Sequence, residues 1–246
     1  MGIENHVNEN LKELFDFIYR TNQLDTGNEF PERDAQALSS LVRTILKERS
    51  MVLEIGSWKG RSTIILAGTV HPLDGRIFAI DTWMGSPGVP HHECAKEIDI
   101  FSIFKNNLKT LELESFVHPL VMDSLIASKI FAYNVLDLIF IDGDHRYERV
   151  MQDISSWLPK LRYGGILCGH DCEGYYWQYP ERIKDLIGQH IGEDYIPHID
   201  HPQADPGVHP GVVKAVYDHL GTNFGIMPNS TIWYYVKKFE GRQPSL

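Results

Sequence analysis

The chain has 246 residues, of which 43% are hydrophobic and 23% charged, as in an ordinary globular protein. This length suits one α/β domain with elaborations. The formal net charge of -10 argues against a surface for nucleic acid or for an anionic membrane, because both need clustered lysine and arginine.

The cysteine content and the lack of long apolar segments in the sequence indicate the cellular compartment. Cys94, Cys168 and Cys172 are too few for a disulfide framework, so a reducing cytoplasm is the simplest environment. The N-terminal sequence MGIENHVNEN lacks the apolar segment of a signal peptide, and no apolar run approaches the roughly 20 residues of a membrane span. We therefore expect a cytoplasmic protein with neither a nucleic-acid nor a membrane partner.

Two amphipathic helices are predicted before the first strand. Apolar residues recur at three- and four-residue spacings over 7–21 and over 31–46, and Pro31 suits the first turn of the second helix. We assign residues 1–50 to an N-terminal helical cap and residues 51–246 to the main domain. The cap helices suit either a homo-oligomer contact or a lid.

From residue 51 onward, strand and helix patterns alternate. Strands are predicted at 51–55, 76–81, 116–121, 135–141 and 164–169, with helices near 61–70, 97–111, 124–131 and 146–159. This alternation predicts a doubly wound α/β fold, in which a mostly parallel sheet carries helices on both faces. Residues 223–227 and 231–238 predict a C-terminal antiparallel hairpin, which brings the sheet to seven strands with the last one reversed.

A long aromatic and histidine-rich insertion separates the fifth strand from the hairpin. It covers about 172–210 and contains one predicted helix at 181–190. Insertions of this length in a compact domain are usually lids or binding loops, and we expect a lid here.

The loop after the first strand points to a cofactor without phosphate. The segment from Glu54 through Gly56 and Gly60 to Ser62 connects a strand to a helix, where glycine lets the backbone approach a ligand. A dinucleotide fingerprint would need a glycine at the position of Glu54, and no P-loop pattern is present. A carboxylate there would repel pyrophosphate but would pair with an ammonium group, so the ligand is nucleoside-like and carries a positive amino acid part.

Two further acids follow the next two strands. Asp81 ends the second strand, where an acid can accept hydrogen bonds from ribose hydroxyls. Asp123 and Ser124 follow the third strand and could accept from an adenine amino group. Acids after three successive strands form one coherent nucleoside-binding set.

These segments resemble a known family. VLEIGSWKGRST, IFAIDTW, VMDS, FIDGDHRYERVMQDISSWLPKLRYGGILCGHD and HPGVVKAV resemble the class I S-adenosylmethionine-dependent methyltransferases, in the branch of small-molecule O-methyltransferases with D-G-D-H and G-H-D motifs. The resemblance covers about 50–238 and implies a Rossmann-like fold with S-adenosylmethionine as cofactor. By position it assigns the cofactor to Glu54, Gly56, Ser57, Gly60, Ser62, Asp81, Thr82, Trp83, Asp123, Ser124 and Asp142.

Two polar clusters should meet at the reaction site. The fourth strand ends in Asp142, Asp144 and His145, and the fifth ends in His170 and Asp171. Such a set can bind a divalent cation or supply a general base. The resemblance implies metal ligands at Asp142, His170 and Asp171, and Asp144 or His145 is the candidate base. His170 stands where relatives carry an acid, and imidazole favours Mn²⁺, iron or Zn²⁺ over Mg²⁺.

The sequence therefore predicts methyl transfer from S-adenosylmethionine to a hydroxyl oxygen of a small-molecule acceptor, assisted by a divalent metal (Mg, Mn or similar). A cation-free mechanism with His145 as base stays open. The alternatives are a metal-dependent protein linked to hydroxylation, a non-catalytic S-adenosylmethionine-binding module and, disfavoured by Glu54, a nicotinamide dehydrogenase. His209, in an H-P-G segment, could also face the site.

Overall fold

The computed structural model describes residues 24–27, 30–203 and 206–239. The helix predicted over 7–21 lies outside these residues. None of the helices in the described ranges is long and apolar enough to cross a membrane.

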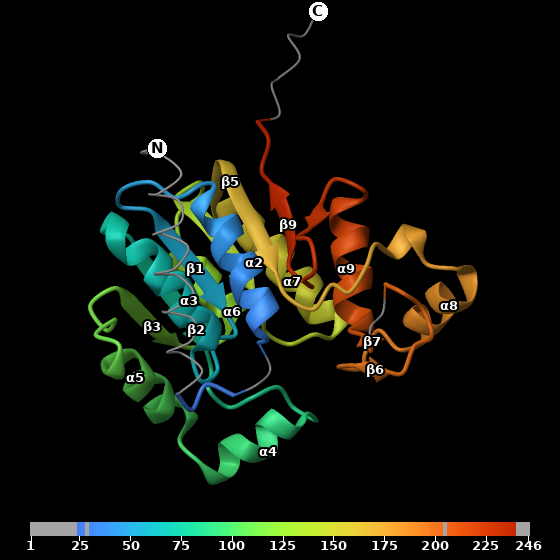
Figure 1. The fold of residues 1–246 in the computed structure, drawn as a ribbon, viewed down its shortest axis with the longest axis horizontal. Helices are drawn as coiled ribbons and strands as arrows, with labels where there is room; N and C mark the ends of the chain where they lie inside the picture. Colours follow the sequence, from blue (N-terminus) through green and yellow to red (C-terminus); the bar gives the residue numbers. More distant parts are fainter. Residues whose placement is uncertain (1–23, 28–29, 204–205, 240–246) are drawn as a thin grey trace, which may run out of the picture.

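The fold is built on one twisted sheet (Figure 1). In the described chain seven strands pair in the order β3-β2-β1-β4-β5-β9-β8, and β9 alone runs antiparallel to its neighbours. The strand bounds are β1 (Met51–Ile55), β2 (Arg76–Asp81), β3 (Val117–Val121), β4 (Leu136–Ile141), β5 (Leu161–Gly169), β8 (Gly225–Ile226) and β9 (Trp233–Val236). The predicted doubly wound, mostly parallel sheet with a C-terminal antiparallel hairpin is confirmed.

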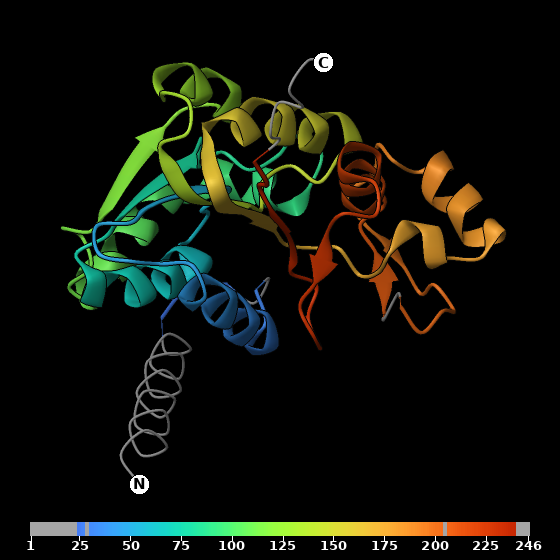
Figure 2. The same cartoon turned by 90° about the horizontal axis from the view of Figure 1, so that it is seen from above.

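Helices cover both faces of the sheet, as Figure 2 shows from above. One face packs against α2 (Glu32–Arg43), α3 (Arg61–Val70) and α5 (Ile100–Thr110). The other packs against α6 (Ser124–Ala127), α7 (Tyr147–Trp157) and α9 (Pro210–Leu220), and α8 (Glu181–Gln189) packs on α9. Every residue of β4 is buried, as a central strand between two helical layers requires.

The elements differ from prediction at a few points. The helix predicted over 97–111 is α5 and begins at Ile100, because Asp99 caps it by accepting a hydrogen bond from the Ser102 backbone N–H. A separate helix before it, α4 (Pro90–Glu97), was not predicted. Helix α9 was not predicted, although Val212, Val213 and Val216 fall on one buried face. The insertion holds α8 and a small antiparallel pair, β6 (Ile196–Pro197) and β7 (Gly207–Val208). Single 3-10 turns complete the chain at His71–Leu73, Ser128–Ile130, Leu158–Lys160 and Tyr176–Gln178.

The turn between β1 and α3 is held against the end of β4. Gly56 has φ +86°, and a Cβ there would lie 1.9 Å from the carbonyl oxygen of Asp142. The Asp142 N–H in turn donates to the Ile55 carbonyl at 2.8 Å. Because only glycine fits this contact, the ends of β1 and β4 are fixed side by side.

Glu54 stabilises the same turn through hydrogen bonds. Its buried carboxylate accepts hydrogen bonds from Ser57 Oγ at 2.7 Å and from Thr63 Oγ1. Burial raises the pKa of Glu54 to about 7, although these hydroxyl donors oppose the rise. The folded protein therefore binds the Glu54 proton more tightly than the unfolded chain does.

Replacing Glu54 should change how stability depends on pH. A raised pKa in the folded state means that stability is greatest below about 4.5 and falls as the pH rises toward about 7, by up to roughly 3 kcal/mol. Glu54→Gln should remove this loss, so the variant should gain stability relative to wild type between pH 5 and pH 8. Urea unfolding at several pH values measures the difference, and Glu114→Gln, at an exposed position, is the matched control. A constant offset between variant and wild type across this range would contradict the assignment.

Candidate functional site

A cavity of about 460 Å³ lies at the carboxyl edge of the sheet. Ligands in open α/β sheets bind at this edge, where the strand order reverses, and the volume is within the usual range for small-molecule sites. Residues that follow β1, β2, β3, β4 and β5 all contribute to its wall.

Most of the predicted site residues line this cavity. The lining includes Gly56, Ser57, Gly60, Ser62, Asp81, Thr82, Asp123, Ser124, Asp142, Asp144, His145, His170 and Asp171. Glu54 and Trp83 lie outside the lining and are buried. Glu54 bonds to the hydroxyls of Ser57 and Thr63, and Trp83 packs on Phe101 and Phe104. The predicted contact of these two residues with a cofactor stays a prediction.

Asp81 is locked into the wall of the cavity by backbone donors. Its two carboxylate oxygens accept from the N–H groups of Trp58 at 2.8 Å and Trp83 at 2.7 Å. Burial raises the pKa of Asp81 against the effect of these bonds. The carboxylate is thus rigid and orders the glycine loop on one side of the cavity.

Asp123 and Ser124 lie at the far end of the same cavity. Asp123 caps α6 through the Leu125 N–H at 2.9 Å and pairs with Arg149 Nη2 at 2.7 Å. The Ser124 hydroxyl donates to Asp153, whose pKa burial raises to about 6. Arg149 and Asp153 also line the cavity and were not predicted from the sequence.

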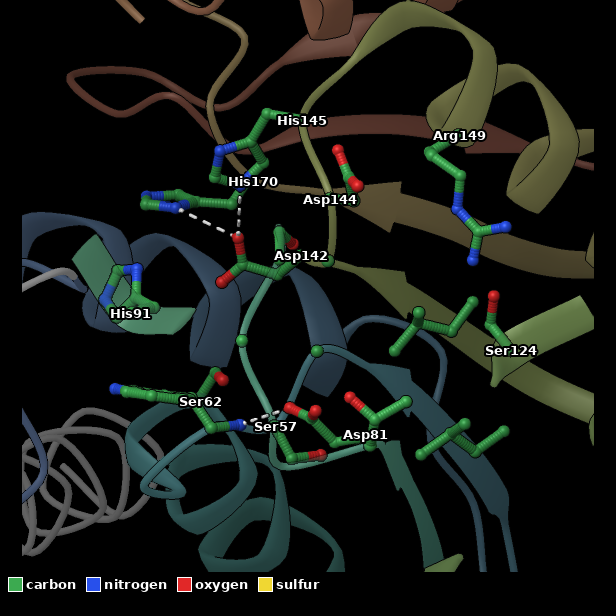
Figure 3. Close-up of a pocket in the computed structure, with 18 of the residues that line it drawn as sticks. Ser57, Ser62, Asp81, His91, Ser124, Asp142, Asp144, His145, Arg149 and His170 are labelled. Carbon is green, nitrogen blue, oxygen red and sulfur yellow. Dashed lines mark hydrogen bonds and ion pairs between the residues drawn. The ribbon is translucent and has the colours of Figure 1, made fainter. Parts of the chain in front are cut away.

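The acids and histidines after β4 and β5 converge (Figure 3). His170 Nδ1 lies 3.1 Å from Asp171 Oδ1 and 3.5 Å from Asp142 Oδ1. His145 Nε2 lies 3.2 Å from Asp171 Oδ2 and 3.7 Å from Asp142 Oδ1. Asp142, His170 and Asp171 thus offer donor atoms within 4.8 Å of one another, a spacing that one metal ion could bridge. The predicted convergence of the two clusters is confirmed.

Three further carboxylates contact the histidines of this region. Asp34 Oδ2, on α2, lies 3.3 Å from His170 Nε2 without an aligned hydrogen bond. Asp194 Oδ1 lies 2.9 Å from His145 Nδ1, and Glu173 Oε1 lies 2.6 Å from His209 Nδ1.

Sequence reasoning missed these three acids. Asp34 had a usable signal, because it falls on the apolar stripe of its helix with Leu38 and Leu41. Asp194 and Glu173 lie in the insertion and carry no comparable pattern.

These contacts shift the protonation of the cluster. Burial alone would raise the pKa of Asp142 and Asp171, but the facing imidazoles, His170 first, hold both below the ordinary range. Burial alone would lower the pKa of His145 and His170, yet Asp171 and Asp142 raise both well above 6.5. The cluster therefore attracts positive charge, whether protons or a metal ion.

Asp144 is separate from that cluster. Arg146 Nε donates to its carboxylate oxygens at 2.9 Å and 3.1 Å, and Arg146 Nη2 donates to the same group. Burial raises the pKa of Asp144, but the hydrogen bonds and charge of Arg146 outweigh burial and lower it. Asp144 is consequently a weak proton acceptor.

Comparison with known proteins places these features in a family. Residues 53–172 match a family described as "Methyltransferase domain". Among curated proteins, R132 of Acanthamoeba polyphaga mimivirus is 22% identical over 65% of this chain and 70% of its own length. The protein y4gI of Sinorhizobium fredii is 26% identical over 52% of this chain and 14% of its own length. Both of these relatives are uncharacterised.

Solved structures share the fold. A Corynebacterium glutamicum protein aligns with TM-score 0.59 and 14% identity over 92% of both chains. A Staphylococcus aureus protein described as a caffeoyl-CoA O-methyltransferase aligns with TM-score 0.54 and 14% identity over 94% of this chain and 93% of its own. The O-methyltransferase NovP aligns with TM-score 0.55 and 15% identity over 84% and 80%. Residues 53–172 of the chain therefore match a methyltransferase domain, and the chain shares its fold with these solved structures.

Proposed function

We propose that the protein transfers a methyl group from S-adenosylmethionine to a hydroxyl oxygen of a small-molecule acceptor, with a divalent cation held by Asp142, His170 and Asp171. The observation that carries this proposal is the cation-binding geometry of these three residues inside the same cavity as the nucleoside-binding acids. Two structural neighbours are described as O-methyltransferases, which supports oxygen as the methyl acceptor.

The residues present fit S-adenosylmethionine. Gly56 and Gly60 line the cavity, and their lack of a Cβ lets the loop pack against Asp142 and Phe104 with its backbone facing the ligand space. Asp81 presents a rigid carboxylate for the ribose hydroxyls, and Asp123 with Ser124 lies where the adenine would bind. The cofactor supplies the methyl group on a positively charged sulfur, and the chain's acids on this edge suit that charge.

The residues also fit a divalent cation. Metal-bound histidine usually donates its other ring N–H to a carboxylate, which fixes the ring and its tautomer. Asp34 lies beside His170 Nε2 and would leave Nδ1 free to bind the ion between Asp142 and Asp171. One imidazole with two carboxylates favours Mn²⁺ or a similar ion over Mg²⁺. When bound, such a cation lowers the pKa of a coordinated hydroxyl and orients it.

The two predicted bases do not stand free in the site. Arg146 holds Asp144, and His145 contacts Asp142, Asp171 and Asp194. We therefore assign activation of the hydroxyl chiefly to the cation site rather than to a general base.

The proposed acceptor is a small molecule in the cytoplasm rather than nucleic acid, since the net charge is -10. The lid role of 172–210 and a homo-oligomer through the N-terminal cap stay predictions.

Asp81→Asn should weaken cofactor binding. The variant loses one acceptor oxygen and the negative charge, and hydrogen bonds to a charged group contribute about 1.5–3 kcal/mol. The dissociation constant for S-adenosylhomocysteine, measured by calorimetry, should therefore rise roughly tenfold or more. Asp185→Asn, at an exposed position on α8, should leave binding unchanged. Equal affinity in Asp81→Asn and wild type, with circular dichroism showing both folded, would count against the nucleoside site.

Chelation should stop methyl transfer. With a panel of catechols and deoxysugars as acceptors, EDTA should abolish turnover, and Mn²⁺ should restore it better than Mg²⁺ because of the His170 ligand. Asp142→Asn should lower turnover by about a hundredfold or more while S-adenosylhomocysteine still binds. Turnover should be the same with and without oxygen, which separates methyl transfer from the hydroxylation alternative. Activity that survives both chelation and metal re-addition unchanged would refute the metal assignment.

A further inference from the structure

Asp171 faces two different imidazoles with its two oxygens. Oδ1 lies 3.1 Å from His170 Nδ1, and Oδ2 lies 3.2 Å from His145 Nε2. The proposed catalytic ion would use the first oxygen. Asp171 also belongs to a second group of donors, with His145 and His209, whose atoms lie within 4.8 Å of one another, and His209 Nδ1 lies 3.6 Å from Asp171 Oδ1.

Each imidazole of this second group also contacts a carboxylate of its own. Asp194 contacts His145 Nδ1 at 2.9 Å, and Glu173 contacts His209 Nδ1 at 2.6 Å. Glu173 also accepts the His209 backbone N–H at 3.0 Å, which fixes the residue just before α9. A carboxylate on one ring nitrogen is the arrangement that prepares a histidine to bind a metal through its other nitrogen. His145, with Asp194 at Nδ1 and Asp171 at Nε2, has this arrangement, as His170 has with Asp34.

The region carries an excess of negative charge that protons or metal ions can offset. The cluster contains five carboxylates, of Asp34, Asp142, Asp171, Glu173 and Asp194, and Arg33 lies 3.6 Å from Asp34. Metal ligation requires neutral imidazoles, which leaves about four negative charges at a mostly buried site, where charges must be paired or coordinate metal. In that state one divalent ion would offset half of the charge, and two would offset it fully.

We infer that His145, Asp171 and His209 bind a second divalent cation, with the Asp171 carboxylate bridging the two ions. Two imidazoles and one carboxylate suit Mn²⁺, Fe²⁺ or Zn²⁺. The inference rests on the proposed function, because Asp171 is shared with the first ion. In this arrangement His145 is a metal ligand and its Nε2 is engaged, so it is not the general base of the reaction.

Counting bound Mn²⁺ tests the inference directly. Metal-free wild-type protein is titrated with MnCl₂, and bound ions per chain are determined by electron paramagnetic resonance and elemental analysis. We expect two ions in wild type, with a spin-coupled spectrum from the bridged pair, and one ion in His209→Gln. His219→Gln, at the other end of α9, is the matched control and should retain two.

Conservative variants of the outer carboxylates keep the test valid if His209→Gln fails to fold. Glu173→Gln should weaken the second Mn²⁺ by about ten- to a hundredfold and leave the first unchanged. Asp34→Asn should weaken the first Mn²⁺ and leave the second unchanged. One ion in wild type, or two ions still bound by His209→Gln, would overturn the second site and leave the proposed function intact. No bound ion in wild type would overturn the metal part of the proposed function as well and would make the cluster a network of imidazolium–carboxylate pairs.

Discussion

The site depends on the contact between the ends of β1 and β4. Gly56 allows the glycine loop to pass so close to Asp142 that any side chain at residue 56 would overlap the Asp142 carbonyl. Because the loop lines one side of the cavity and Asp142 belongs to the cluster of acids and histidines on the other, this single approach sets the distance between the two parts of the proposed site. Glu54 and Asp81 then hold the loop through hydrogen bonds with Ser57 and Trp58.

The cluster of acids and histidines is costly for the fold. Asp34, His170 and Asp171 are buried, and Asp34 Oδ2 and His170 Nε2 lack an aligned hydrogen-bond partner in the described chain. Buried polar atoms without partners normally destabilise a protein by about 1–3 kcal/mol each. His170 lines the cavity and Asp34 lies directly behind it, which fits a site where binding takes precedence over stability.

The sequence was sufficient to predict the sheet and most of the residues that line the cavity, because both depend on local patterns. β1 and β2 match the predicted bounds, and the acids at their ends follow from parallel strands sharing one edge. The outer carboxylates could not be predicted in the same way. Asp194 and Glu173 reach the histidines only through the path of the insertion, and no periodic pattern encodes that path. Helix α9 was not predicted because its apolar valines follow directly on the insertion, without a clear boundary between loop and helix.

The bond between Asp34 and the Thr231 backbone N–H spans 197 positions of the chain at 2.9 Å. It joins α2 to the segment just before β9, directly beside His170. Closing a contact between segments so distant in sequence costs loop-closure entropy, which the packing of α2 and of the C-terminal hairpin must offset. A change in the hairpin would therefore reach the side chain of His170 through Asp34, although no described residue of the hairpin lines the cavity.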